Sequence, residues 1–263
     1  MTDDILLTDI DERGVARVIF NRPEIHNAFD AAMIAGLTDI LAGLDGDAAV
    51  RAVVVSGTGK SFSAGADFNW LQSTAGYSEA ENMADAEKLG EMLRLLNGLS
   101  KPTLALVQGG AFGGGVGVVC CCDIAIASED ARFSLSEVKI GLIPATISPY
   151  VVRAMGERQA RRYMLTGEVF GAAEAMRLGI VHEVVPADEF EAAGEDKIDA
   201  LFEGGPGAQA AIKRLIARVA PGPVDAGMIA DTARRIAESR ATEEAAEGMA
   251  AFFEKRKPAW RDE

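Results

Sequence analysis

The sequence has little of what marks several large classes of protein. Among its 263 residues, 26 Lys and Arg stand against 40 Asp and Glu, which gives a formal net charge of −14. No basic stripe is visible, so we expect no nucleic-acid partner. Only two histidines are present, His26 and His182, and they lie far apart in the sequence. The cysteines also lack metal-ligand spacing, so the sequence predicts no metal site.

Cysteine is equally scarce, and its three copies are adjacent at positions 120–122. Adjacent cysteines cannot build a disulfide framework, so a reducing compartment is the simpler expectation. No apolar run approaches the ~18 residues of a membrane-spanning helix. The acidic start Met1-Thr2-Asp3-Asp4 does not resemble a signal peptide. We therefore expect a cytoplasmic protein without a membrane partner.

What is present is a globular composition, with 49% hydrophobic and 25% charged residues. Up to about residue 190, short apolar runs alternate with amphipathic stretches, which predicts an α/β fold. Strands are expected at 5–7, 15–20, 50–55, 103–107, 123–127 and 181–185, and helices after Asp30 and at 79–99, 113–122, 157–165 and 172–178. From Ala187 onward only helical patterns occur. The sequence therefore predicts an α/β core over residues 1–190 and a helical region over residues 191–263.

Two turns rich in small residues follow predicted strands, one at Phe62–Phe68 and the other at Gly109–Gly115. Small side chains leave backbone N–H groups uncovered, and a helix that begins at such a turn adds the positive end of its dipole. Two turns of this kind facing each other would form an oxyanion hole. Two nucleotide-binding motifs are incomplete. A phosphate loop would need glycine at position 54, which is Val54, and a dinucleotide-binding fingerprint would need glycine at position 118, which is Val118.

Further motifs occur in order through nearly the whole chain. They are Asn21-Arg22-Pro23-Glu24 with Asn27-Ala28, 62–67, 111–115, 122–123, 131–133 with Glu137, 140–144, 165–167, 179–181 and 248–256. Taken together, these motifs resemble those of the crotonase, or enoyl-CoA hydratase/isomerase, superfamily. The resemblance implies a crotonase-like spiral of ββα turns with a C-terminal helical region used for trimerisation.

The resemblance also implies a site. The thioester carbonyl of an acyl-CoA is expected between the backbone N–H groups of Ala66 and Gly114. No cofactor is implied beyond the coenzyme A of the substrate, and the expected partners are acyl-CoA and further copies of the chain, as a trimer or a dimer of trimers. Contacts with substrate or CoA are implied for Arg22, Ala64, Asp67, Phe68, Gly113, Phe252 and Lys255.

Hydratases of the superfamily hold one water between two glutamates. The resemblance places the second of them at Glu137, whereas the first position is Gly117. Beside apolar segments, the Glu137 carboxyl is expected to have a raised pKa, which suits a group that takes and returns a proton. Gly117 lies about one helical turn beyond Gly114, so we expect its Cα to face the acyl pocket and to leave room for a bulky substituent or a water.

With one glutamate, more than one function stays open. We expect a 2-enoyl-CoA hydratase for a branched or carboxylated acyl group. The reason is that 147–150 and 158–163 resemble bacterial methylglutaconyl- and isohexenylglutaconyl-CoA hydratases, which also tend to lack the first glutamate. A Δ3,Δ2-enoyl-CoA isomerase that uses Glu137 alone is the alternative, and a catalytically silent scaffold is a third.

The end of the site that would hold the CoA phosphates departs from the family pattern. Two lysines common in the family are replaced by Glu24 and Asn69. We expect Arg22 to supply one phosphate contact and Lys255, from a neighbouring subunit, to supply another.

Overall fold

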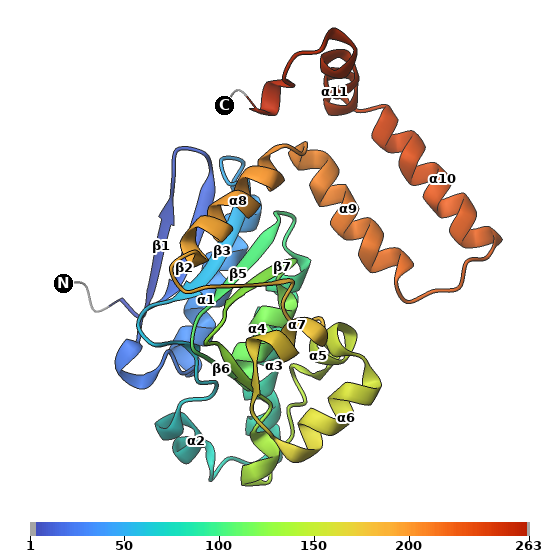
Figure 1. The fold of residues 1–263 in the computed structure, drawn as a ribbon. Helices are drawn as coiled ribbons and strands as arrows, with labels where there is room; N and C mark the ends of the chain where they lie inside the picture. Colours follow the sequence, from blue (N-terminus) through green and yellow to red (C-terminus); the bar gives the residue numbers. More distant parts are fainter. Residues whose placement is uncertain (1–3, 262–263) are drawn as a thin grey trace.

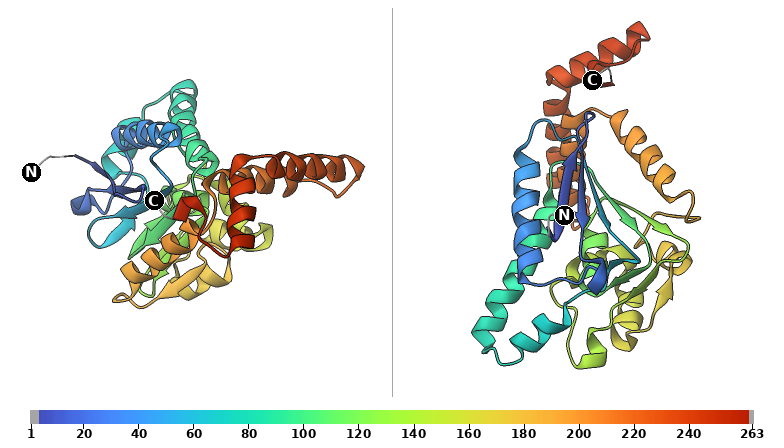
Figure 2. Two further views of the ribbon diagram at one scale, coloured as in Figure 1. Left: turned by 90° about the horizontal axis from the view of Figure 1, so that it is seen from above. Right: turned by 90° about the vertical axis from the view of Figure 1, so that its left-hand side faces the viewer.

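The computed structural model describes residues 4–261 and shows two β-sheets with helices packed around them (Figure 1, Figure 2). The larger sheet has the order β1-β2-β3-β5-β7-β10, and the smaller one has the order β4-β6-β8-β9. Going along the chain, β3 is followed by β4, β5 by β6, and β7 by β8, so the chain visits one sheet and then the other on each turn. The described chain therefore follows a spiral, and the α/β prediction is confirmed.

The strands of the larger sheet are β1 (Leu6–Ile10), β2 (Val15–Phe20), β3 (Ala52–Gly57), β5 (Thr103–Val107), β7 (Ile124–Ser128) and β10 (Glu183–Val185). Those of the smaller sheet are β4 (Ser61–Ser63), β6 (Gly110–Phe112), β8 (Arg132–Ser134) and β9 (Phe170–Gly171). The helices are α1 (Ala31–Gly46), α2 (Phe68–Thr74), α3 (Glu79–Gly98), α4 (Gly114–Cys121), α5 (Ser148–Met155), α6 (Glu157–Thr166), α7 (Ala172–Arg177), α8 (Phe190–Phe202), α9 (Pro206–Val219), α10 (Ala226–Arg240) and α11 (Glu243–Glu254).

Local sequence explains where the first elements begin. The chain reverses between β1 and β2 as an antiparallel hairpin, as the turn-forming residues 11–14 predict. Asp30 then begins α1, because its side chain accepts a hydrogen bond from the backbone N–H of Met33 at 2.9 Å. The apolar β-branched run that predicted a buried strand is β3, which pairs in parallel with both β2 and β5.

The larger of two hydrophobic core clusters among the described residues joins side chains of both sheets and of helices α1, α3, α4 and α5. Helix α1 packs against α3, and α4 packs against α3 and α5. Phe20 contacts Phe29 and Phe62 edge-on, each with ring centroids 5.3 Å apart. Cys121 and Cys122 are buried here as small apolar residues. The core therefore fixes the ends of β2 and β4 and the start of α1 relative to one another.

The C-terminal part has two kinds of helix. Phe190 and Ile198 of α8 pack on the larger sheet, although the sequence placed this helix in the separate helical region. Helices α9, α10 and α11 instead form an arm that extends away from the sheets (Figure 1, Figure 2). Lys213 of α9 holds the base of the arm, since its ammonium donates to Asp123 and to the Lys101 carbonyl.

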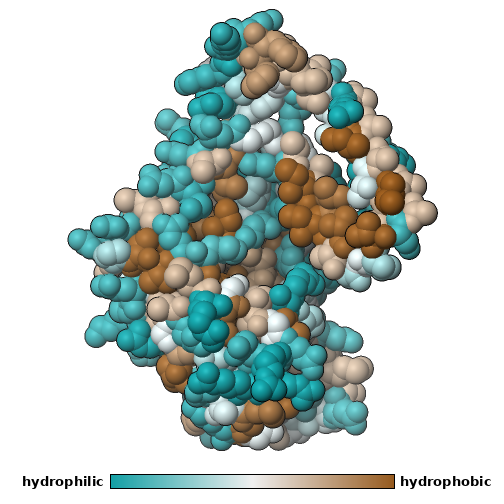
Figure 3. Space-filling view, turned by 45° about the vertical axis from the view of Figure 1, so that its right-hand side comes forward, coloured by the Kyte–Doolittle hydropathy of each residue, from teal (hydrophilic) through white to brown (hydrophobic). Residues whose placement is uncertain are grey.

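The arm leaves apolar side chains exposed. Figure 3 shows brown, apolar surface on and beside the arm. The large apolar side chains exposed on or beside α9, α10 and α11 are Ile212, Ile216, Val224, Ile229, Ile236, Met249, Phe252 and Phe253. Exposed apolar side chains are therefore concentrated on the arm.

Several elements were not predicted. Strands β4, β6, β8 and β9 have two or three residues each, too few to show a period. Helix α2 falls in a segment whose course the sequence left open, and it begins at Asp67, whose side chain accepts from the Trp70 N–H. Among residues 4–261, no helix combines the length and apolarity needed to span a bilayer.

Candidate active site

The two small-residue turns lie side by side because β4 and β6 are parallel neighbours. Gly65 in the first turn has φ +86, a backbone conformation that costs other residues free energy. A Cβ on Gly65 would stand 2.8 Å from the backbone oxygen of Phe112 in the second turn. A side chain at position 65 would therefore push the turns apart, and glycine lets them touch.

The N–H group of Ala66 points away from the segment that carries Phe29. In the bridge between Phe29 and Ala66, Phe29 donates to the Gly65 carbonyl and accepts from the Asp67 N–H. This pattern uses the groups on either side of Ala66 and leaves its own N–H without a hydrogen bond to any described residue.

The second donor is at the start of a helix. Gly114 is the first residue of α4, and the residue before it, Gly113, has φ +49 and provides no side-chain cap. The Gly114 N–H has no hydrogen-bond partner among residues 4–261, as expected for the first turn of a helix. Ala66 and Gly114 line the same cavity of about 230 Å³. The structure thus brings the two predicted donors to one site.

Glu137 lies in this cavity at the start of a short 3₁₀ helix, Glu137–Ile140, which follows β8. A Cβ on Gly113 would be 2.9 Å from the Glu137 Oε1 atom, so the carboxyl lies against the turn that carries Gly114. Burial raises the pKa of Glu137. Its Oε2 atom is buried and has no hydrogen-bond partner in the described part of the chain. An unpartnered carboxylate oxygen in a cavity is available to a substrate or a water.

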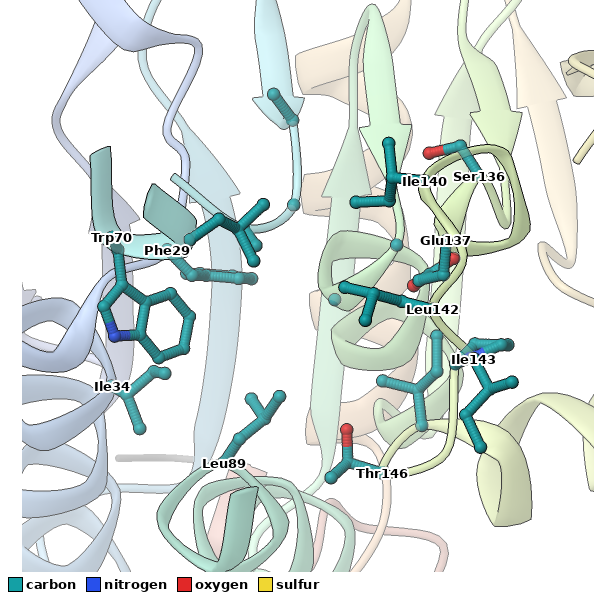
Figure 4. Close-up of a pocket in the computed structure, with 18 residues that line it drawn as sticks. Phe29, Ile34, Trp70, Leu89, Ser136, Glu137, Ile140, Leu142, Ile143 and Thr146 are labelled. Atoms are coloured by element: carbon teal, nitrogen blue, oxygen red, sulfur yellow. The ribbon is translucent and has the colours of Figure 1, made fainter. Parts of the chain in front are cut away.

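The rest of the cavity is largely apolar. Figure 4 shows Phe29, Ile34, Trp70 and Leu89 on one side and Glu137, Leu142 and Ile143 on the other. The complete lining is Phe29, Ile34, Ala64, Gly65, Ala66, Trp70, Leu71, Leu89, Gly113, Gly114, Ser136, Glu137, Ile140, Leu142, Ile143, Pro144, Thr146 and Ile147. Within this described lining, Glu137 is the one acidic side chain, and no Lys, Arg or His is present.

The structure corrects the expectation for Gly117. This glycine is buried and does not line the cavity. A Cβ at position 117 would lie 2.2 Å from the Cγ2 atom of Ile147 and 2.9 Å from its Cβ. The space beside Gly117 is therefore filled by Ile147, and neither a substrate group nor a water can use it.

Arg22 is engaged inside the protein. Its guanidinium donates to Asp30 Oδ2 at 2.7 Å and to the Ala28 carbonyl at 3.2 Å, and it lies 3.9 Å from Asp67. Asp30 and Asp67 are the N-caps of α1 and α2. Arg22 thus links the starts of the two helices that flank the first turn, and its expected phosphate contact stays a prediction.

The other implied contact residues fall into two groups. Ala64 and Gly113 line the cavity, Asp67 is buried beside it, and Phe68 is exposed at the start of α2. Phe252 and Lys255 belong to α11 and its C-cap. Helix α11 lies at the opposite end of the molecule from α2 (Figure 1, Figure 2). One chain alone does not bring these two residues to the cavity, so their contact with substrate requires a second copy and stays a prediction.

Sequence reasoning missed most of the apolar wall. Leu89 falls within the predicted helix 79–99, Ile147 was noted only within the 147–150 resemblance, and Trp70 gave no signal. Their roles arise from contacts between segments far apart in the chain, which no local pattern records.

Comparison with known proteins identifies the family to which the chain belongs. The family described as enoyl-CoA hydratase/isomerase matches residues 11–263. The chain belongs to the enoyl-CoA hydratase/isomerase family. The family assignment confirms the crotonase resemblance, and it identifies the chain as an enzyme of this family.

Individual relatives agree over nearly their full length. The crotonyl-CoA hydratase of Syntrophomonas wolfei is 31% identical, with 94% of this chain and 94% of that protein covered. A solved enoyl-CoA hydratase of Shewanella pealeana is 45% identical, with a TM-score of 0.95, 98% of this chain covered and 97% of that one. The structure of Pseudomonas aeruginosa AtuE is 37% identical, with a TM-score of 0.94, 98% of this chain covered and all (100%) of that one.

Proposed function

We propose that the protein is a 2-enoyl-CoA hydratase, which adds water across the 2,3 double bond of an acyl-CoA thioester. The observation that carries the proposal is the meeting of three groups in one cavity. These are the free N–H groups of Ala66 and Gly114 and the buried carboxyl of Glu137. Relatives named enoyl-CoA hydratase or crotonyl-CoA hydratase support the same reaction.

The chemistry follows from where charge develops. Attack of water on C3 moves the π electrons of the double bond into the thioester, so the carbonyl oxygen becomes negative. The N–H groups of Ala66 and Gly114 are placed to stabilise that oxygen, and one such donor is worth roughly 3–4 kcal/mol. Glu137 takes a proton from the attacking water and delivers a proton to C2, which gives the 3-hydroxyacyl thioester. A raised pKa suits this double role, because the carboxyl must accept and release a proton at similar cost.

The lining favours an uncharged acyl group. A carboxylate on the acyl chain would be buried among Ile34, Leu89, Leu142 and Ile143 without a cation in the described lining. Burial of an unpaired charge is costly. Of the two acyl types that the sequence suggested, the branched apolar one is therefore favoured over the carboxylated, methylglutaconyl-like one.

An isomerase is the second candidate. The specific observation in its favour is Ile147, which occupies the place beside Gly117 and leaves Glu137 as the one carboxylate in the described lining. Transfer of a proton from C2 of a 3-enoyl thioester to C4 needs a single base. The same oxyanion donors would stabilise the intermediate of that reaction.

One assay separates these hypotheses. The purified protein is mixed with 2-enoyl- and 3-enoyl-CoA esters, branched, unbranched and carboxylated, and absorbance of the conjugated enoyl thioester is followed. Loss of the band with a 2-enoyl ester supports the hydratase, and a gain from a 3-enoyl ester supports the isomerase. No change with any ester supports a catalytically silent scaffold and overturns the proposal.

Glu137→Gln tests the assigned base, with Glu129→Gln as the matched control because Glu129 is exposed in a turn after β7. The Glu137→Gln variant should lose about 10²–10⁴-fold in kcat while it still binds acyl-CoA, because the amide keeps the shape but cannot accept a proton. A variant at position 137 that keeps more than about half of the wild-type kcat would remove Glu137 from the mechanism.

We propose further that the active assembly is a trimer or a dimer of trimers in the cytoplasm. The exposed apolar side chains of α9, α10 and α11 support an assembly through this arm. In such an assembly a neighbour could bring Phe252 and Lys255 to the CoA end of the site.

A further inference from the structure

The cavity wall that carries Glu137 also includes Ile147, whose side chain packs against the buried backbone of Gly117. Ile147 lines the cavity and is only 2% exposed. The buried backbone of Gly117 lies directly against it, so that a Cβ there would come within 2.2 Å of Ile147 Cγ2, against an ordinary contact distance of 3.4–4 Å. The side chain of Ile147 can therefore stand as far back from the cavity as it does only because residue 117 is glycine.

The place of this pair along α4 relates it to the reacting carbons. Gly117 follows Gly114 by three residues in the same helix, a rise of about 4.5 Å. A side chain at residue 117 would lean back along the helix toward Gly114, and Ile147 occupies that place. C3 of an acyl group whose carbonyl oxygen meets the Gly114 N–H is three bonds from that oxygen, so Ile147 is the residue of this wall set to face the substituents on C3.

We propose that Gly117 and Ile147 act as a coupled pair that sets how bulky a substituent on C3 the acyl pocket admits. The inference rests on the proposed function for the orientation of the acyl chain. A smaller residue at 147 enlarges the pocket at C3. A larger residue at 117 pushes Ile147 forward and narrows it. The two positions are 30 residues apart in the sequence, yet a change in side-chain size at either one alters the same part of the pocket.

The test uses saturated acyl-CoA esters, which bind but have no double bond to hydrate. Isothermal titration gives Kd for 3-methylbutyryl-CoA and for butyryl-CoA, and the ratio of the two values isolates the effect of the C3 methyl group. Ile147→Ala should lower the ratio of branched to unbranched Kd by about tenfold or more, and Ile147→Val should lower it by less. Gly117→Ala should raise the ratio. The double variant Gly117→Ala, Ile147→Ala should return it to within a few-fold of wild type, because the added methyl group meets the space that the removed isoleucine leaves.

Thermal unfolding accompanies each titration. Should Gly117→Ala not fold, the graded series Ile147→Val and Ile147→Ala still decides the matter. An unchanged ratio in Ile147→Ala, with both Kd values altered by one common factor, would overturn the proposal. A double variant that keeps the ratio of either single variant would overturn the coupling. Failure of the wild type to turn over any enoyl ester would count against the hydratase while leaving the Kd ratios meaningful.

Discussion

Gly65→Ala tests whether contact between the two turns creates the oxyanion site. The structure indicates two ways in which this substitution lowers the free energy of unfolding. Gly65 has φ +86, which costs a residue with a side chain about 1–2 kcal/mol. Its new Cβ would also stand 2.8 Å from the Phe112 carbonyl oxygen, and relief of such overpacking costs about 1–3 kcal/mol.

The expected loss of stability is the sum of these costs, about 2–5 kcal/mol. At about 2–4 °C per kcal/mol, the midpoint of thermal unfolding should fall by roughly 4–20 °C. Because the backbone must shift to relieve the contact, the Ala66 N–H should also move relative to Gly114. Loss of one oxyanion donor lowers kcat by about 10²–10³-fold.

The assay follows hydration of an enoyl-CoA ester at a temperature at which the variant is fully folded, alongside a thermal melt. Gly43→Ala in α1 is the matched control, since a Cβ there meets no atom within 4 Å. The control should keep wild-type kcat and gain about 1 kcal/mol or less in stability. A Gly65→Ala variant that loses stability but keeps wild-type kcat would refute the link between turn contact and catalysis.

Four further outcomes are expected. Burial raises the pKa of Glu137, so its contribution to stability is present at low pH and is lost as pH rises through the folded-state pKa. At about pH 8, Glu137→Gln should therefore have a higher midpoint of thermal unfolding than wild type, and at about pH 4 the two midpoints should be equal. The same difference in midpoint at both pH values would contradict a buried carboxyl with a raised pKa. Arg22→Met should lower stability by about 1–3 kcal/mol, because it leaves Asp30 and Asp67 without their guanidinium, and an unchanged urea midpoint would refute this role. Lys213→Met should loosen the base of the arm and speed amide exchange in α9, whereas exchange at the wild-type rate would show that the contact with Asp123 is dispensable. Light scattering should give a trimer or hexamer at micromolar concentration, and a monomer would argue against assembly through the arm.

Local rules predicted the framework of the fold well. The hairpin, the N-cap at Asp30 and the buried strand β3 each follow from a few consecutive residues. The small-residue turns were also readable, since glycine at position 65 and the helix that begins at Gly114 are local signals. Glu137 was found through the family resemblance, and its raised pKa follows from the burial that its apolar neighbours predicted.

Contacts between distant segments were not predictable in the same way. Gly117 was interpreted as open space because a sequence shows a missing side chain and does not show the neighbour that fills the gap. Ile147 fills it from a loop 30 positions further along the chain. Arg22 was a candidate for phosphate because its charge is visible, whereas its carboxylate partners Asp30 and Asp67 become apparent only in the folded chain.

The parallel pairing of β4 with β6 sets the spacing within the oxyanion site. Neighbouring strands in a sheet are about 4.8 Å apart, whatever the length of chain between them. The turns that carry Ala66 and Gly114 follow these two strands directly, so the distance between the two donors is inherited from the sheet. The chain between them, which includes α2 and α3, can lengthen or shorten without changing that distance. Helix α2 and the start of α3 could therefore diverge to reshape the acyl pocket while the chemistry at the thioester stays in place.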